Sequence, residues 1–395
     1  MSGAEDFFRS KVFCYLAPFT ALATYLIYMI ATGRMEFMKG YYELSYLFTY
    51  DHGFVSKGFV GEVISWFTDT VTPDIIRGVS IFGAVLLVIA ASLCFGSVLD
   101  KTRDDRTAFT AAAVIIALLC IAPFTFRIHL IEMKQDKFIW AFALFAVYFS
   151  QFKFGIWLAP IFCMIATLIN PLFLVGGMLL VSIILLQKCK ENGFAAKNII
   201  ICAVSYIGMI ALGVYSVASG KSHGFADPYE MIEFYFSRYT GTLSESELKL
   251  LAGEQMIEYF GTRDAAFFKD VFRVYVLESD VGVYTILNAV FFALPLIVLL
   301  AIFWKKTIAE ESDKFNKFIF FLCPATLVSV LFMVLLAWGA RFFFYSYIVQ
   351  TGLLLYFIAN KNEAVMKTLG KVTDFCKEHT IASAVALIYF AVFFK

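Results

Sequence analysis

The chain has 395 residues, of which 61% are hydrophobic and 18% aromatic, and its formal net charge is +1. A soluble domain of this length cannot bury so much apolar surface, and a near-neutral chain has no overall field that attracts nucleic acid. These values predict an all-α, polytopic integral membrane protein whose natural partners are membrane lipids.

Apolar runs long enough to cross a bilayer recur along the whole chain. We expect a single membrane domain over residues 1–395 with roughly eleven transmembrane helices, near 12–33, 78–98, 108–125, 138–152, 154–169, 171–187, 199–218, 283–304, 317–338, 342–359 and 380–394. Proline interrupts helices, so the region 154–187 allows two readings. It forms either two short spans that meet at Asn170-Pro171, or one long kinked span followed by a re-entrant piece.

Cationic residues indicate the orientation, because short cytoplasmic loops are enriched in lysine and arginine. With the N-terminus in the cytoplasm, the inner loops carry Lys101, Arg103, Arg106, Lys188, Lys190, Lys197, Lys305, Lys306, Lys314, Lys317, Lys361, Lys367, Lys371 and Lys377. The outer loops carry fewer cations. This bias predicts a cytoplasmic N-terminus and an outer face that carries the two long segments described next.

Two outer segments are long enough to have structure of their own. The first, residues 34–77, is rich in tyrosine and phenylalanine and is typical of amphipathic helices that lie in the membrane interface. The second, residues 219–282, predicts three short helices. Capping patterns at Asp227-Pro228-Tyr229-Glu230 and Ser244-Glu245-Ser246-Glu247 begin the first two, and Asp264 begins the third.

The first outer segment contains a glycine-punctuated polar run, Asp51-His52-Gly53 followed by Lys57-Gly58. Glycine lets the backbone turn sharply or approach a ligand, and a carboxylate beside the membrane can accept a proton from an attacking hydroxyl. We therefore predict Asp51 as a catalytic base, His52 as an alternative base and Lys57 as a phosphate ligand. The alternative is an interfacial turn in which Asp51 pairs with Lys57 or His52.

Ionisable groups also crowd the run from Arg127 to Lys137. Cations in such a loop can bind a phosphate or diphosphate, and arginine does so with two parallel hydrogen bonds. From this run we predict His129 as a further base. Four other residues are predicted as phosphate or substrate ligands: Arg127, Glu132, Asp136 and Lys137. The alternative is a solvated helix cap held by internal salt bridges.

Two isolated residues complete the predicted site. Arg341 ends an expected outer span among aromatic residues, and we predict that it binds phosphate. The alternative is that its side chain simply extends to lipid headgroups. Asn170 precedes Pro171, where a helix break either lines a cavity with free backbone groups or only kinks the helix.

Several chemistries lack a signal in the sequence. The eight cysteines show no disulfide framework and no metal-binding spacing, and no nucleotide-binding or hydrolase motif is present. No cofactor is predicted, although carboxylates such as Asp51, Glu62, Glu132 and Asp136 offer oxygen ligands for a divalent metal. Ionisable residues are almost absent inside the expected spans, which weighs against an ion-coupled transporter.

In its layout, the chain resembles the polytopic bacterial enzymes of envelope polysaccharide assembly, namely GT-C-type glycosyltransferases and O-antigen or capsule polymerases. The shared features are ten or more spans, a first outer loop with an acidic residue, and a large outer loop in the second half. The resemblance implies transfer of a sugar from a polyprenyl (di)phosphate donor to a glycan acceptor, with Asp51 as base and Lys57, Arg127, Lys137 or Arg341 around the carrier phosphates. Here Asp51 lies well after the expected first span, and we expect no soluble domain in the C-terminal part of residues 1–395. The alternatives are a flippase or transporter of lipid-linked oligosaccharide or another lipid, and a non-catalytic scaffold of an envelope assembly complex.

Overall fold

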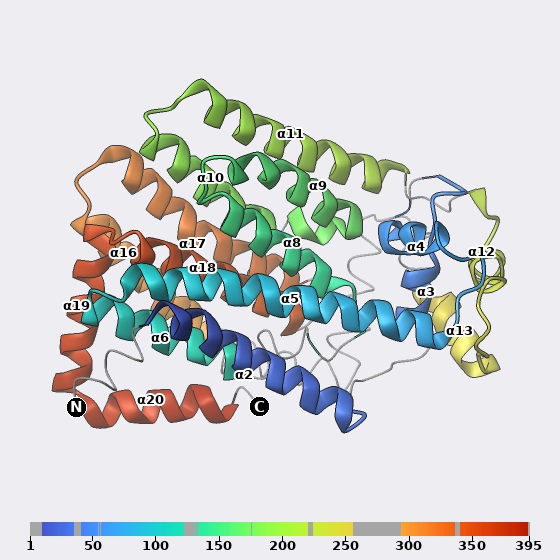
Figure 1. Ribbon diagram of the computed structural model, residues 1–395, viewed down its shortest axis with the longest axis horizontal. Helices are drawn as coiled ribbons and strands as arrows, with labels where there is room; N and C mark the ends of the chain where they lie inside the picture. Colours follow the sequence, from blue (N-terminus) through green and yellow to red (C-terminus); the bar gives the residue numbers. More distant parts are fainter. Residues whose placement is uncertain are drawn as a thin grey trace.

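The computed structural model describes residues 10–34, 41–53, 55, 57–121, 130, 133–174, 176–219, 224–255, 294–335 and 340–393. Over these residues the protein is helical, apart from one isolated β-bridge between Val71 and Tyr239. Most of the long helices run along one direction and form a bundle (Figure 1). They are α2 (Lys11–Ala31), α5 (Pro73–Thr102), α6 (Arg106–Ile121), α8 (Asp136–Phe149), α9 (Ala159–Ile169), α10 (Gly177–Glu191), α11 (Ala196–Ser219), α16 (Leu294–Glu310), α17 (Lys314–Leu335) and α18 (Ala340–Ala359). The last helix, α20 (Thr380–Phe393), lies apart from them (Figure 1).

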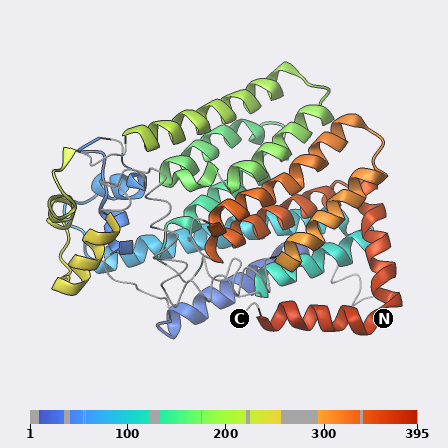
Figure 2. The same cartoon turned by 180° about the vertical axis from the view of Figure 1, so that it is seen from behind.

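Short helices cover one end of the bundle, and α19 (Glu363–Glu378) crosses the opposite end (Figure 1). The covering helices are α3 (Tyr41–Leu47), α4 (Gly58–Ser65), α12 (Pro228–Phe236) and α13 (Glu245–Gln255). Figure 2 shows α16, α17 and α18 side by side on the reverse face. The two ends of the bundle therefore differ, and we call the end with α3, α4, α12 and α13 the capped end.

Each expected apolar segment coincides with helix wherever the structure describes it. The helical path over residues 154–187 is interrupted at Asn170-Pro171. The 3-10 helix η2 (Gly155–Leu158) leads into α9, and the 3-10 helix η3 (Pro171–Leu174) separates α9 from α10.

Within the described part of the chain, three helices are long and apolar enough to cross a membrane. They are Lys11–Ala31, Pro73–Thr102 and Ala196–Tyr215. Apolar side chains on their surfaces are exposed, among them Ile27, Phe82 and Ile207. Such exposure is costly in water but favourable against lipid, so these helices are suited to a bilayer.

The central helix α5 begins at a strong local signal. Thr72 accepts a hydrogen bond from the backbone N–H of Ile75, and Pro73 occupies the first turn, where no N–H is needed. Two glycines let neighbouring helices approach closely. A Cβ atom at Gly83 would lie 2.6 Å from the Phe138 ring of α8, and one at Gly96 would lie 2.3 Å from the Tyr15 ring of α2.

The capped end joins segments that are far apart in the sequence. The N–H of Val71 donates to the carbonyl of Arg238 (2.7 Å), and the N–H of Thr240 donates back to Val71 (3.1 Å). The Tyr239 hydroxyl donates to Glu43 of α3 (2.6 Å). Backbone and side-chain hydrogen bonds thus join the segment that contains α12 to the first long segment, residues 34–77.

Both capping patterns in residues 219–282 form as predicted. Asp227 accepts the N–H of Glu230 (2.9 Å) at the start of α12, and Ser244 accepts the N–H of Glu247 (3.3 Å) at the start of α13. The third predicted helix, which begins at Asp264, lies outside the described residues.

Candidate functional site

Two charged residues in the first turn of α8 are buried. Asp136 is 1% exposed and Lys137 is fully enclosed. The sequence interpretation began this apolar segment at residue 138, but the helix begins two residues earlier and carries both charges inside. A negative side chain at a helix N-terminus is favoured by the helix dipole, which helps to hold Asp136 there.

Three helices meet at these two residues. The Lys137 ammonium donates to the Ser80 hydroxyl of α5 at 2.9 Å. The Asp136 carboxylate accepts a hydrogen bond from the Tyr345 hydroxyl of α18. The Trp140 ring of α8 lies edge-on to the Tyr345 ring, with 5.2 Å between centroids. We call Ser80, Asp136, Lys137 and Tyr345 the buried polar cluster.

Helix α3 of the capped end lies directly over this cluster. The Tyr46 hydroxyl donates to the carbonyl of Met133 (2.6 Å), and the Gln135 side chain donates to the carbonyl of Ser45 (2.8 Å). Burial raises the pKa of Tyr46, a hydrogen bond with Ser80 lowers it, and the Asp136 charge raises it further. The net direction is upward, so Tyr46 is a neutral hydrogen-bond donor at physiological pH.

Asp51 lies on the surface of the capped end. Its carboxylate accepts a hydrogen bond from the Thr49 hydroxyl at 2.6 Å, and its side chain is exposed. The carbonyl of Thr49 in turn accepts the Tyr235 hydroxyl of α12 at 3.4 Å. Asp51 is therefore held in place by the first long segment, and its side chain is open to solvent.

His52 has a different environment from Asp51. Its ring packs against Phe225 and Phe234, with centroid distances of 4.6 and 4.4 Å. Both phenylalanines belong to the second long segment. The packing favours a role for His52 in joining the two segments.

Lys57 precedes α4 and adopts a left-handed backbone conformation, with φ of 71°. Helix α4 crosses tightly over the preceding chain, since a Cβ at Gly61 would lie 2.1 Å from the carbonyl oxygen of Phe48. Its Glu62 accepts the N–H of Tyr50 (2.9 Å) and the indole N–H of Trp66 (3.2 Å). Gly61 and Glu62 thus have structural roles in placing α4.

The remaining predicted residues are placed only in part. Asn170 ends α9 in an extended conformation and is 3% exposed. Arg341 lies in the first turn of α18, four residues before Tyr345, and its side chain is outside the described part of the structure. Arg127, His129 and Glu132 lie outside the described residues.

No family model, curated protein or solved structure matches this chain. The chemistry of the side chains is therefore the guide to function. Among the described residues, no three His, Cys, Asp or Glu side chains gather in a way that would hold a metal ion.

Sequence reasoning missed Tyr46, Ser80 and Tyr345. Each is a hydroxyl residue inside or beside an apolar run, where nothing local distinguishes it from a packing residue. The available signal was the Asp136-Lys137 pair immediately before an apolar helix, since a charge that cannot reach water requires buried polar partners.

Proposed function

We propose that this protein is a bacterial inner-membrane glycosyltransferase or polymerase, which transfers a sugar from a polyprenyl (di)phosphate donor to a glycan acceptor. We further propose roughly eleven transmembrane helices, a cytoplasmic N-terminus and a periplasmic capped end. The lysine and arginine bias supports this orientation. The agreement between apolar segments and helices supports the span count.

One observation carries the proposal. At the capped end, residues 45–51 connect an exposed carboxylate to a buried charged cluster. Tyr46 and Ser45 contact the start of α8, where Asp136 and Lys137 lie, and Thr49 positions Asp51 a few residues later. A solvent-accessible base at the edge of a membrane domain suits proton removal from a glycan hydroxyl.

The proposed roles follow from charge and access. Asp51 takes the proton of the acceptor hydroxyl, while Lys57, Arg127 and Arg341 bind the departing diphosphate through charge-assisted hydrogen bonds. Lys137 donates to Ser80 and is enclosed, so we assign it a positioning role beneath the site. The aromatic side chains of α12 would hold the glycan by stacking.

The test is sugar transfer by the purified protein in nanodiscs, with a polyprenyl-diphosphate-linked glycan as donor and acceptor. Removal of a general base typically costs about 10²–10⁴-fold in rate, so Asp51→Asn should lose at least about a hundredfold in turnover. Asp69→Asn is the matched control, since Asp69 is an exposed carboxylate of the same long segment. Equal turnover in the two variants would refute Asp51 as the base.

A second function, translocation of a lipid-linked sugar, is favoured by the buried Asp136 and Lys137. Ionisable groups inside a membrane domain often mark a transport pathway. In proteoliposomes that contain a fluorescent lipid-linked sugar and no acceptor, a flippase would expose the label on the opposite leaflet without making a new glycosidic bond. A scaffold would show neither transfer nor translocation.

A further inference from the structure

A cavity of about 50 Å³ lies between α5, α8, α10 and α18, near the end of the bundle opposite the capped end. Its wall is apolar and comprises Cys94, Phe95, Val98, Leu144, Val147, Leu180, Gly352, Leu355 and Ala359. Its polar residues are Lys101, Gln151, Tyr356 and Asn360. At about 10–15 Å³ for each water-sized group, the cavity has room for roughly three to five small groups.

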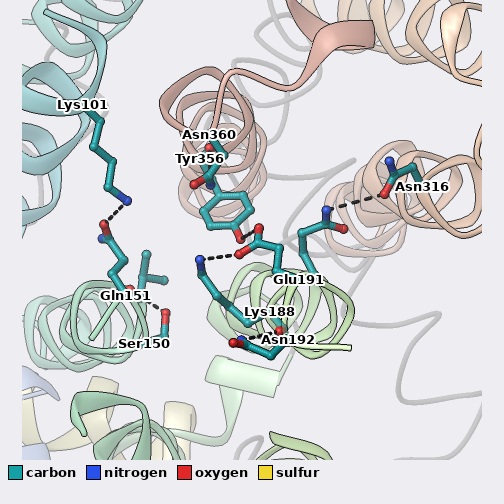
Figure 3. Close-up of polar contacts among 11 residues, drawn as sticks. Lys101, Ser150, Gln151, Lys188, Glu191, Asn192, Asn316, Tyr356 and Asn360 are labelled. Carbon is teal, nitrogen blue, oxygen red and sulfur yellow. Dashed lines mark hydrogen bonds and ion pairs between the residues drawn. The ribbon is translucent and has the colours of Figure 1, made fainter. Parts of the chain in front are cut away.

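Lys101 is held at this cavity by an uncharged partner. Its ammonium donates to the Gln151 side-chain oxygen at 2.7 Å (Figure 3). The same oxygen accepts the Ser97 hydroxyl at 2.9 Å. Lys101 forms no salt bridge with any residue that the structure describes. Among the described residues, the Lys101 ammonium is therefore held by an amide oxygen and contacts no carboxylate directly.

The nearby carboxylates are engaged elsewhere. Asp100 pairs with Arg103 at 3.2 Å. Glu191 pairs with Lys188 at 2.6 Å and accepts the Tyr356 hydroxyl at 3.2 Å (Figure 3). The arrangement leaves one cation available at the mouth of an apolar cavity.

If α5 crosses a bilayer, its length would place Lys101 at the depth of the lipid headgroups. Helix α5 has 30 residues and is about 45 Å long at 1.5 Å per residue, longer than the roughly 30 Å hydrocarbon layer. Both ends of α5 therefore reach the headgroup regions, and Lys101 lies in its last turn. Basic pockets between transmembrane helices at this depth bind the phosphate of anionic lipids.

We propose that this cavity binds a single-chain lipid phosphate, with the phosphate on Lys101 and the first carbons of the chain between α5, α8 and α18. A single chain suits a cavity that admits only a few carbon groups, whereas the glycerol of a two-chain phospholipid is broader. The proposal concerns the end of the bundle opposite Asp51. It does not depend on glycosyl transfer, and its test requires no turnover.

The experiment measures binding of farnesyl phosphate to the full-length protein in nanodiscs of neutral phosphatidylcholine. A charge-assisted hydrogen bond contributes about 1.5–3 kcal/mol, so Lys101→Gln should weaken binding about tenfold or more, while Lys101→Arg should retain it. Val98→Phe, which fills the cavity and keeps the charge, should also weaken binding. Lys306→Gln removes an exposed lysine of α16 and is the matched control.

Four results would overturn the proposal. Equal binding by Lys101→Gln and the wild type would remove Lys101 from the site, and equal losses in Lys101→Gln and Lys306→Gln would indicate general surface charge. Inorganic phosphate that competes as well as farnesyl phosphate would show a simple anion site. Displacement of farnesyl phosphate when phosphatidylglycerol is added to the nanodiscs would assign the cavity to a two-chain phospholipid.

Discussion

The Lys137 ammonium is enclosed by protein at the start of α8, which is a costly position for a positive charge. Its hydrogen bond to Ser80 and its proximity to the other polar groups of the buried polar cluster compensate for lost water. Because such compensation depends on every member, the cluster ties α5, α8 and α18 into one arrangement. Its residues therefore matter for stability, whatever the reaction.

We predict that Lys137→Met lowers the free energy of unfolding by about 1.5–3 kcal/mol, the contribution of a hydrogen bond made by a charged group. The long apolar methionine retains most of the volume, so the loss reports the ammonium. Thermal unfolding of the purified protein in detergent measures the change. Lys306→Met makes the same chemical change at an exposed position and should have little effect, and similar losses in both would contradict a special role for Lys137.

The placement of helix α4 depends on two adjacent residues, Gly61 and Glu62. It packs so closely on residues 46–48 that the space at Gly61 admits only hydrogen. Glu62, the next residue, bonds both Tyr50 and Trp66 and keeps α4 in register with the chain that carries Asp51. The shape of the capped end thus depends on this contact.

Gly61→Ala should displace α4 and destabilise the capped end, because overpacking a tight contact costs about 1–3 kcal/mol. We expect the backbone amides of residues 58–65 to exchange hydrogen faster in this variant. Hydrogen-exchange measurements test this expectation. Gly78→Ala is the control: nothing lies within 4 Å of the added Cβ, and alanine in a helix is favoured over glycine by about 1 kcal/mol. Protection in residues 58–65 that stays unchanged in Gly61→Ala would argue against the close contact.

At the scale of the whole molecule, the bundle has two different ends. The capped end combines α3, α4, α12 and α13 around Asp51, and the opposite end carries the Lys101 cavity and α19. If α5 spans the bilayer, the two ends face opposite aqueous compartments. The proposed sugar-transfer site and the proposed lipid phosphate site would then lie on opposite sides of the membrane.

Cysteine labelling tests this arrangement. We expect Ser246→Cys in α13 to react with a membrane-impermeant maleimide in intact cells, and Ser312→Cys, between α16 and α17, to react only after permeabilisation. Both serines are exposed, and the exposed native Cys376 is first replaced by alanine to remove background. Labelling of both positions from the same side would contradict a bundle that spans the membrane in this way.

Local sequence signals predicted the long apolar helices and two of the helix caps, but they missed α19 and placed the start of α8 two residues too late. Apolar runs of spanning length coincide with helices wherever the structure describes them, and the caps at Asp227 and Ser244 form as expected. The reason is that helix periodicity and capping involve residues within one or two turns of each other. The catalytic role of Asp51 stays a prediction, although its exposure is compatible with that role.

Only the tertiary structure decided which polar groups meet. Tyr345 is 209 residues from Asp136, Ser80 is 57 residues from Lys137, and Tyr46 is 87 residues from Met133. A single sequence does not encode such pairings in any local pattern, since they arise from how the helices pack. The same packing buries the side chains of Asp136 and Lys137. The sequence alone is equally compatible with both side chains facing water.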